Sequence, residues 1–379
     1  MRKILIACDS FKESLSAFEV NAAIEDGFRH VFPDARYVLL PMADGGEGTA
    51  AILSRTTGGM LHTRSVRGPL GAPVAAHFGV LGDGRTAVVE LAEAAGLALI
   101  PEVARDPLLA STYGVGELIS AALDLGCNRI ILALGGSATN DGGAGMAQAL
   151  GIRFHDADVV DLAPGGVHLA TLAAVDLETR DRRLDDAVIE IACDVHNPLC
   201  GPDGASAIFG PQKGATPAMV RMLDDALMRF STCLETATGV NVRDMPGGGA
   251  AGGAGAGGVA LLGGRLRAGV DIVADTLGLD ALLDGVDLVI TGEGRLDHQT
   301  IRGKVPVGVA RRAKSRGIPV IAIAGSLGTG CDEVHAHGID AVFDVVPRPG
   351  TLADALRDAR DNLTRTARNV AATLAIGGR

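Results

Sequence analysis

Short apolar runs that stop abruptly at Gly, Asp or Ser recur along this 379-residue chain. Each run is four to six residues long and leads into a stretch with helical periodicity. This pattern is typical of buried parallel strands that alternate with helices. Because ligands of open α/β sheets bind beyond the carboxyl ends of strands, the polar residues after each run are the candidates for chemistry. The runs cover residues 3–8, 37–42, 129–134, 189–193, 288–291 and 320–324.

Amphipathic helices are indicated near both ends of the chain. Apolar residues at helical spacing predict one over 16–31, with Ser14 or Ser16 as its cap and Pro33 beyond its end. The same period predicts helix over 351–374. The apolar face of the first helix consists of Ala17, Val20, Ile24 and Phe28.

Two parts of the chain differ in their pattern. Residues 1–55 and 285–379 alternate strand and helix cleanly, whereas 56–284 is richer in glycine and loops. The middle part also has extra alternating runs, at 72–80 and 86–91. We therefore expect an α/β fold in which a discontinuous parallel-sheet domain is interrupted by a second α/β domain.

Glycine is abundant, with 53 residues, and it is densest at 246–264, where ten of nineteen residues are glycine. A flexible linker is one interpretation of this segment. Alternation with alanine favours close backbone packing or a turn that approaches a ligand. The segment contains G-x-G-x-x-G, which carries little weight in so glycine-rich a stretch.

Charge and composition exclude several classes of protein. There are 34 Lys and Arg against 45 Asp and Glu, a net charge of −11, and aromatic residues are 3% with no Trp. Both features argue against nucleic-acid binding. The six cysteines form no C-x-x-C pair, and no apolar run approaches the roughly 18 residues of a membrane span. We expect a cytoplasmic protein with neither nucleic-acid nor membrane partners.

The string GGSATNDGGAG at 135–145 is the most informative motif. It follows a predicted strand and leads into a predicted helix. Its glycines permit positive φ, and free N–H groups at a helix start form an anion site. Asp141 could bind a metal or cap the helix. The chain has no Walker A motif. The loop residues with this chemistry are Gly135, Gly136, Ser137, Thr139, Asn140 and Asp141.

Together with Asp141, acidic residues follow five of the predicted strands, which is more than solvation requires. Carboxylates and lysines there can contact a substrate or a phosphate, and a carboxylate beside an amide suits a hard cation. They are Asp9, Ser10 and Lys12 after the first run, Asp44 and Glu47 after the second, Asp194 and Asn197 after the fourth, Glu293, Asp297 and Lys304 after the fifth, with Lys213 on a separate Gly/Pro turn.

Several long strings occur in an order that resembles the bacterial glycerate kinase family, of the type found in glucarate/galactarate and glyoxylate pathways. The resemblance covers essentially the whole chain. It implies ATP-dependent phosphorylation of D-glycerate with Mg²⁺, usually to 2-phosphoglycerate. It also implies two α/β domains, one of them discontinuous and Rossmann-like, with the active site in the cleft between them. The strings are DSFKESLSA, ADGGEGT, GGSATNDGGAGM, ACDVHNPL, IFGPQKGA, TGEGRLDHQT, GKVP and IAGS.

This resemblance leads to a mechanistic hypothesis for the candidate residues. Phosphoryl transfer needs charge neutralisation and in-line positioning above all. The loop at 135–141 would hold the nucleotide phosphates, and Asp194, as the preferred carboxylate, would orient or deprotonate the substrate hydroxyl. Lys12, Lys213 and Lys304 would bind the carboxylate of glycerate or the transferred phosphoryl group.

The hypothesis divides the residues into four predicted sets. They are catalytic residues (Asp194, Lys12, Asp297 and Lys304), nucleotide-binding residues (Gly135, Gly136, Ser137, Thr139, Asn140 and Asp141), substrate-binding residues (Asp9, Ser10, Asp44, Glu47, Asn197 and Lys213), and Mg²⁺ ligands, of which one or two of Asp194, Glu293 and Asp297 would serve. The predicted partners are D-glycerate and ATP, and a homodimer is compatible with them.

Three alternatives were weighed against a glycerate 2-kinase. A glycerate 3-kinase would give 3-phosphoglycerate by the same chemistry. A nucleotide-dependent dehydrogenase would need G-x-G-x-x-G after the first strand, where this chain has DSFKES. A non-catalytic sensor of sugar acids would need neither a nucleotide nor acidic residues at so many strand ends.

Overall fold

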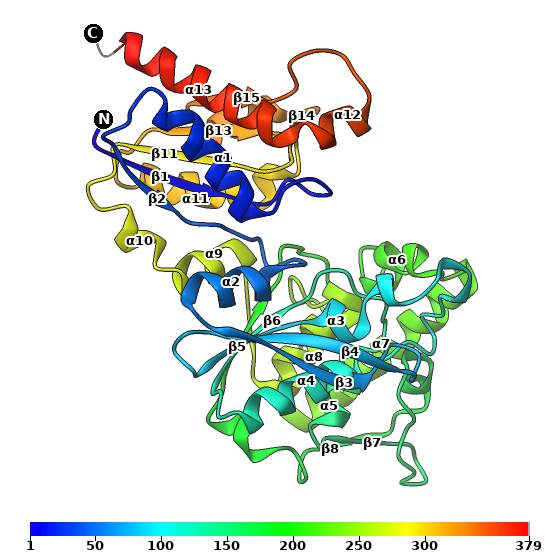
Figure 1. Cartoon of the computed structure of the whole chain (residues 1–379). Coiled ribbons are helices and arrows are strands. Elements are labelled where there is room, and N and C mark those ends of the chain that lie inside the picture. Colours follow the sequence, from blue (N-terminus) through cyan, green and yellow to red (C-terminus); the bar gives the residue numbers. More distant parts are fainter. Residues whose placement is uncertain (378–379) are drawn as a thin grey trace. The chain divides into compact units, whose positions relative to one another are not determined.

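The computed structural model describes residues 1–377. The chain forms two compact units, a first unit of Met1–Asp44 with the chain from Gly269 onward, and a second unit of Gly45–Ala268. Both are α/β units with parallel strands (Figure 1), which confirms the predicted fold class. The predicted boundaries, after residues 55 and 284, fall later in the chain than those of the compact units.

The first unit is built on a parallel sheet with the order β15-β13-β11-β1-β2. From β1 the chain moves to β2 on one side and later returns to β11 on the other. The gap between β1 and β11 is therefore the point where the strand order reverses, and in such sheets ligands bind beyond the strand ends at this point. The strands are β1 (Lys3–Cys8), β2 (Arg36–Leu39), β11 (Leu288–Gly292), β13 (Val320–Ala324) and β15 (Ala341–Asp344).

Helices cover both faces of this sheet. In Figure 1, α1 (Ala17–Arg29) and α13 (Ala359–Gly377) lie side by side on one face, and α11 (Val305–Lys314) packs on the other. The two neighbouring helices approach closely at Gly27, where a Cβ would lie 2.4 Å from the carbonyl oxygen of Thr364. A side chain at this position would therefore force the helices apart.

The predicted N-terminal helix is confirmed, and the predicted C-terminal helix is divided. Ser16, not Ser14, caps α1 in a capping box with Glu19. The helical pattern over 351–374 forms two helices, α12 (Leu352–Arg357) and α13. Asp358 separates them because its backbone leaves helical geometry, with φ −93° and ψ 10°.

The second unit has a mixed sheet with the order β10-β9-β6-β5-β4-β3. Four strands are parallel, and β4 and β3 extend the sheet as an antiparallel hairpin. The parallel part brings the carboxyl ends of β5, β6 and β9 to one edge. The strands are β3 (Met60–Arg67), β4 (Pro73–Val80), β5 (Thr86–Glu90), β6 (Arg129–Ala133), β9 (Val188–Ala192) and β10 (Arg265–Arg267).

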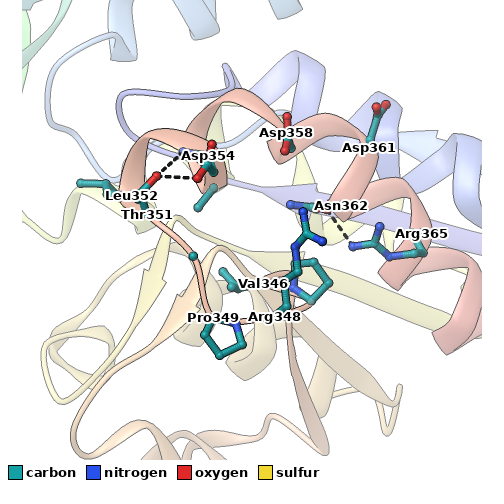
Figure 2. Close-up of a pocket in the computed structure, with 13 residues that line it drawn as sticks. Val346, Arg348, Pro349, Thr351, Leu352, Asp354, Asp358, Asp361, Asn362 and Arg365 are labelled. Atoms are coloured by element: carbon teal, nitrogen blue, oxygen red, sulfur yellow. Dashed lines mark hydrogen bonds between the residues drawn. The ribbon is translucent and has the colours of Figure 1, made fainter.

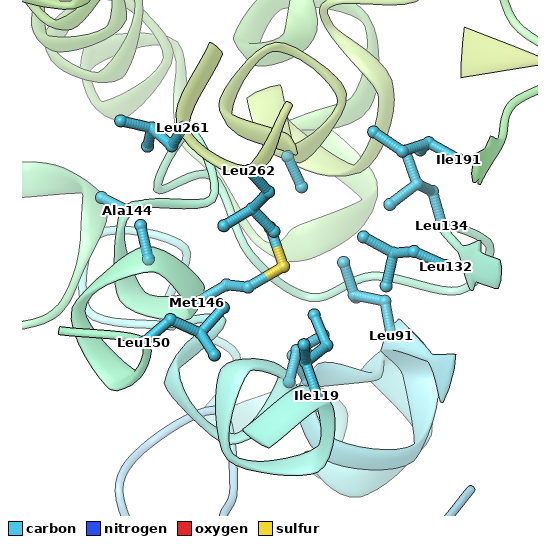
Figure 3. Close-up of a cluster of buried hydrophobic side chains, with 14 of the residues drawn as sticks. Leu91, Ile119, Leu132, Leu134, Ala144, Met146, Leu150, Ile191, Leu261 and Leu262 are labelled. Atoms are coloured by element: carbon cyan, nitrogen blue, oxygen red, sulfur yellow. The ribbon is translucent and has the colours of Figure 1, made fainter. Parts of the chain in front are cut away.

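Helices bury one face of this sheet in a large apolar core. Figure 3 shows part of this core, in which Met146 lies near Ile119, Leu150 and Leu262. On the opposite face, α2 packs on β4 and β5. The helices of this unit are α2 (Thr49–Thr57), α3 (Leu91–Ala95), α4 (Tyr113–Asp124), α5 (Ala144–Ala149), α6 (Ala205–Phe209), α7 (Pro217–Thr238) and α8 (Ala250–Leu262).

The glycine-rich segment is a packed helix rather than a linker, so the prediction of close backbone packing is confirmed. It forms α8, which is interrupted by left-handed residues from Ala251 to Gly253. A Cβ at Gly252 would lie 2.0 Å from the carbonyl oxygen of Thr139, and one at Gly257 would lie 2.1 Å from that of Gly142. The backbone of α8 thus supports the loop that follows β6.

Shorter elements complete the two units. Within residues 1–377, no helix is both long and apolar enough to cross a membrane. The first unit also contains α9 (Gly269–Thr276), α10 (Leu279–Leu282), β12 (Arg295–Leu296) and β14 (Ser326–Leu327), and the second unit contains β7 (Arg153–His155) and β8 (Ala174–Asp176).

Candidate functional site

Three predicted carboxylates meet at the switch point of the first unit. Asp9 follows β1, Asp44 follows β2 and Glu293 follows β11. Burial, then the negative charge of Asp44, then that of Glu293 raise the pKa of Asp9 to about 7. The charges of Asp44 and Glu293 raise the pKa of Asp9 because they lie close to it. The three residues, predicted from separate strand ends, therefore form one acidic cluster.

Glu293 is also the centre of a hydrogen-bonded group with residues of the following loop. Its Oε1 accepts a hydrogen bond from Thr300 Oγ1 at 2.5 Å, and its Oε2 lies 3.5 Å from Lys304 Nζ. Burial raises the pKa of Glu293, and the ion pair with Lys304 opposes that rise. Asp297 joins the group because its backbone N–H donates to Thr300 Oγ1 at 3.1 Å. The structure therefore brings together Glu293, Asp297 and Lys304.

Thr300 and Asn21 are site residues that the sequence analysis missed. Thr300 is fully buried and links Glu293 to Asp297. Asn21, on α1, accepts the backbone N–H of Cys8 at 3.2 Å and so holds the end of β1. Thr300 could have been suspected from its place at the end of TGEGRLDHQT, whereas Asn21 lies in an ordinary amphipathic helix.

Lys12 and Ser10 lie on the loop between β1 and α1. The Lys12 side chain is exposed, and its backbone passes close to Gly294, where a Cβ would lie 3.2 Å from Lys12 N. The Ser10 N–H donates to Asp9 at 2.6 Å. These contacts place the predicted Lys12 beside the loop that carries Glu293.

In the second unit, the loop after β6 has the backbone that its glycines predict. Gly136, Gly142 and Gly143 adopt positive φ angles of 72°, 65° and 76°. The loop packs on the α3 segment through a hydrogen bond from Leu97 N to Gly136 O at 2.9 Å. Gly135 lies against Gly46, because a Cβ at Gly135 would be 3.4 Å from Gly46 Cα. Two glycine-rich loops of this unit are therefore neighbours.

Asp141 caps the helices around this loop. It is fully buried, and its carboxylate accepts hydrogen bonds from Thr112 N at 2.8 Å and Thr112 Oγ1 at 2.9 Å. It also accepts from the N–H groups of Gly143 at 3.1 Å and Gly145 at 3.3 Å. Burial raises the pKa of Asp141, and these donors oppose the rise. The sequence leaves two roles open for Asp141, metal ligand and helix cap. These contacts show that it is a helix cap.

Lys213 lies under the same loop and is only 2% exposed. Its Nζ donates to Ser137 Oγ at 2.8 Å and to Thr139 O at 2.6 Å. Burial lowers the pKa of Lys213 to about 7, and the charge of Asp141 acts in the opposite direction. The predicted substrate-binding lysine thus makes its hydrogen bonds to the loop itself.

Two buried polar atoms of the loop lack partners within the described residues. Thr139 Oγ1 and Asn140 Oδ1 have none, although the Asn140 Nδ2 donates to Ser206 Oγ at 2.9 Å. Both residues are 0% exposed. Buried polar atoms in folded proteins are almost always hydrogen-bonded to protein, water or ligand. A water or a ligand at the loop would supply the missing partners.

The other predicted residues of the second unit lie at the ends of β9 and near the start of α2. Asp194 is exposed directly after β9, and Asn197 donates from Nδ2 to Asp203 O at 2.9 Å. Glu47 is exposed just before α2. The start of α2 is held by a residue that the sequence analysis missed, the buried Glu90, which accepts the N–H groups of Gly48 at 3.0 Å and Ala50 at 2.7 Å.

The first unit offers carboxylates suited to a hard cation. Among residues 1–377, no group of three or more His, Cys, Asp or Glu is arranged to hold a metal ion. Mg²⁺ needs fewer protein ligands, because it keeps several waters and binds one or two carboxylates plus substrate phosphates. Glu293 and Asp297 supply carboxylate oxygens of the kind that such an ion requires. The contact that links Asp297 to Thr300 is made by its backbone N–H, and its carboxylate lies 3.3 Å from Arg295 Nε.

A separate hollow of about 950 Å³ lies beyond the end of β15. Figure 2 shows it between the segment that carries Arg348 and the helices α12 and α13, where Arg365 donates to Asn362 at 2.7 Å. Its lining belongs to residues 346–365. The predicted site residues of this unit instead lie after β1, β2 and β11, so the hollow is distinct from the acidic cluster.

Comparison with known proteins gives this arrangement a family. The family model described as "Glycerate kinase family" matches residues 4–375. The chain is 54% identical over 377 residues to a protein of Escherichia coli K12 named glycerate 2-kinase, with 100% of this chain and 99% of that one covered. It is 52% identical to the glycerate kinase of Bacillus subtilis 168, with 98% and 97% covered.

A solved structure agrees with the sequence comparisons. A crystal structure from Salmonella typhimurium LT2, which carries the provisional name glycerate kinase 2, superposes with a TM-score of 0.92. The two chains are 55% identical, with 100% of this chain and 99% of that one covered. The chain belongs to the glycerate kinase family, and it is an enzyme, a kinase.

Proposed function

We propose that this enzyme transfers the γ-phosphoryl group of ATP to the C2 hydroxyl of D-glycerate, giving 2-phosphoglycerate and ADP. The observation that carries the proposal is the full-length similarity, at 54% identity, to a protein named glycerate 2-kinase. Two features of the structure support it. The loop after β6 has a buried lysine and an unpartnered Thr139 hydroxyl, which suit an anion, and the acidic cluster of the first unit suits a cation.

In this proposal the loop after β6 binds the nucleotide phosphates. The N–H groups at the start of α5 are taken up by Asp141, Thr112 and Gly252, so the phosphates would meet the earlier part of the loop. There Gly135 and Gly136 keep the backbone free of side chains. Ser137, Thr139 and Asn140 add short polar side chains. Phosphoryl transfer depends mainly on positioning and charge stabilisation, which such a loop provides.

The acceptor side of the proposal uses the strand ends of the first unit. Lys304 and Lys12 attract the carboxylate of glycerate or the phosphoryl group in transfer. One or two of Glu293, Asp297 and Asp194 would hold Mg²⁺. When bound, Mg²⁺ would neutralise phosphate charge. Asp9, Ser10, Asp44, Glu47 and Asn197 stay proposed substrate-binding residues.

The chemical step needs a single proton acceptor. The C2 oxygen of glycerate forms a bond to the γ-phosphorus while the bond from that phosphorus to the bridging oxygen of ADP breaks. The hydroxyl proton passes to a carboxylate, for which Asp194 is the proposed residue because it is exposed directly after β9. General-base catalysis of this kind contributes typically 10²–10⁴-fold. An Asp194→Asn variant within a few-fold of wild-type turnover would remove that assignment.

A combined ³¹P and ¹H NMR time course tests the reaction. Purified protein is mixed with Mg²⁺, ATP and D-glycerate, with L-glycerate and acceptor-free samples as controls. We expect ADP to form together with a phosphomonoester coupled to the C2 proton. A product coupled to the C3 protons would keep the kinase and replace the proposal with a glycerate 3-kinase. Absence of any glycerate-dependent product from folded protein would contradict D-glycerate as the acceptor.

A further inference from the structure

Lys213 is buried against a loop rather than presented to a substrate. It ends a short 3₁₀ turn (Pro211–Lys213) that follows α6, and only 2% of it is exposed. A lysine ammonium has three N–H donors and no acceptor. Two of these donors are used within the second unit, on Ser137 Oγ and on Thr139 O. The charge of Lys213 therefore lies directly under the loop that the proposed function gives to the nucleotide.

The hydrogen bond from Lys213 fixes the polarity of the Ser137 hydroxyl. A serine oxygen can accept and donate at the same time. Because the ammonium can only donate, Ser137 Oγ must accept from it, and the Ser137 hydroxyl proton must point toward another acceptor. The backbone of Ser137 is held independently, by a bridge to Gly96. Ser137 is thus presented as a hydrogen-bond donor on a fixed backbone.

The neighbouring loop residues give independent evidence for a ligand. Thr139 accepts from Lys213 through its backbone carbonyl, while its own hydroxyl oxygen is buried without a partner in the described chain. The Asn140 Oδ1 beside it is also unpartnered, but as an acceptor it calls for a donor and not for a phosphate oxygen. Asp141 is saturated by donors from two helix starts. Lys213 and Asp141 therefore hold the backbone of the loop, while two of its polar side chains lack hydrogen-bond partners within the described chain. This is the arrangement of a preformed polar site.

We propose that Lys213 is a positioning residue for the nucleotide. Its ammonium turns the Ser137 hydroxyl into a donor toward a phosphate oxygen, and it places a positive charge beneath the loop without touching the substrate. This inference rests on the proposed function, because it takes the loop to be the phosphate site. It replaces the substrate-binding role that the sequence predicts for Lys213, and it makes nucleotide affinity depend on the protonation of that lysine.

The surroundings of Lys213 set the direction of this dependence. Asp141 is the negative charge that acts on its ammonium, and Arg105 packs on the backbone of the same turn, donating to Gln212 O at 3.2 Å. Burial lowers the pKa of Lys213 to about 7. Above that pH the neutral amine can accept the Ser137 proton, and the donor toward the phosphate is lost. A bound phosphate favours the ammonium, so nucleotide binding takes up a proton.

Isothermal titration calorimetry with Mg²⁺-ADP tests the inference on the whole protein. Titrations at pH 6.5 and 8.5, in buffers of different ionisation enthalpy, measure both affinity and proton uptake. For the wild type we expect weaker binding at pH 8.5 and uptake of up to about one proton at that pH. For Lys213→Met we expect roughly 10- to 100-fold weaker ADP binding and no lysine-dependent proton uptake. Lys213→Arg should restore part of the affinity without the pH dependence.

Two further variants separate positioning from general disruption. Ser137→Ala should weaken ADP binding, and adding Lys213→Met to it should cost less than in the wild type, because the two groups act on the same hydrogen bond. The matched control is Lys314→Met, which removes a surface lysine paired with Asp340. It should leave ADP affinity and its pH dependence unchanged. If Lys213→Met does not fold, the wild-type proton uptake and Lys213→Arg decide the question.

The outcomes distinguish this inference from the function on which it rests. Normal ADP affinity and pH dependence in Lys213→Met overturn the positioning role while leaving the kinase intact. A rise in KM for D-glycerate with KM for ATP unchanged would overturn it in favour of a substrate ligand. Wild-type binding of ADP without proton uptake also overturns it. Failure to phosphorylate D-glycerate, with ADP binding as expected, contradicts the acceptor alone. Absence of ADP binding by the wild type contradicts both.

Discussion

The two units place their buried charges in opposite ways. In the first unit, Asp9 lies near two other carboxylates, and this crowding together with burial raises its pKa to about 7. In the second unit, Asp141 is more deeply buried than Asp9, but donors from the neighbouring backbone and from Thr112 enclose it. A bound cation or a proton would relieve the repulsion between the carboxylates of the first cluster. Asp141 needs neither, because its hydrogen bonds are satisfied within the fold, and a ligand of the loop would meet a backbone already held in place.

In the proposed function, this difference lets one chain serve two kinds of ligand. A crowded group of carboxylates favours positive charge and so suits Mg²⁺ or a lysine near the transferred phosphoryl group. A rigid glycine loop with a lysine beneath it favours negative charge and suits phosphates. Four substitutions break or sharpen the contrast.

The largest effect is expected for Lys304→Met in the first unit. Lys304 is the cation closest to Glu293, with Nζ 3.5 Å from Oε2, and its removal leaves the acidic cluster without that charge. We expect kcat/KM for phosphoryl transfer to fall roughly 10²- to 10³-fold, as for loss of one charge-stabilising group. Steady-state kinetics measure this, and thermal unfolding shows whether the fold is intact. Activity within threefold of wild type would exclude Lys304 from the site.

The second prediction concerns the free energy of unfolding, which Asp9→Asn and Asp141→Asn should change in opposite directions. The folded pKa of Asp9 is above its unfolded value, so ionising this group costs stability as pH rises through about 4 to 7. Removing the charge should therefore raise the free energy of unfolding at pH 8 by roughly 1–3 kcal/mol. Burial raises the pKa of Asp141 as well, but four N–H and O–H donors face its carboxylate and an amide cannot accept from all of them. We therefore expect Asp141→Asn to lower the free energy of unfolding by roughly 2–3 kcal/mol.

Urea denaturation without added divalent cation measures both variants. The test should be repeated at pH 5, where Asp9 is already protonated in the folded state and Asp9→Asn should gain much less. Destabilisation by Asp9→Asn at pH 8, or stabilisation by Asp141→Asn, would show that the contrast between the units is wrong.

The smallest effect is expected for Glu90→Gln. Glu90 accepts two N–H groups at the start of α2 and so fixes the helix that follows Glu47. Loss of one acceptor and of the charge near a helix start should cost about 1 kcal/mol of stability. The same urea experiment measures it, with Glu93→Gln, a half-buried neighbour paired to His77, as the control. An equal loss in both variants would remove the special role of Glu90.

Much of the fold follows from local patterns in the sequence. Apolar runs that end in Gly or Asp identify the parallel strands, because a strand buried on both faces must be apolar throughout. The left-handed glycines of the loop after β6 follow from the same local logic. The division between α12 and α13 could not be predicted from spacing, since the apolar period continues across Asp358 while the backbone does not.

The site was predictable only as far as its residues follow strand ends. Asp9, Asp44 and Glu293 could be named because three strands lead to them. Glu90 and Asn21 could not be, since each acts by accepting N–H groups of residues distant in the chain or on another element. Lys213 likewise meets a residue far away in the chain, since Ser137 lies 76 residues before it. No local pattern predicts which distant residue a lysine will contact.

The pairing of β1 with β11 has a consequence for the order in which the protein folds during synthesis. Ile4 pairs with Leu288, so one edge of β1 has no strand beside it until most of the chain has been made. The second unit, by contrast, is contiguous from Gly45 to Ala268 and has all its strands before β11 emerges. Domains tend to fold as units as they leave the ribosome, so the second unit should fold first. Until β11 is made, residues 4–8 have an unpaired apolar edge. That edge can pair with other chains, so we expect aggregation chiefly at this stage of synthesis.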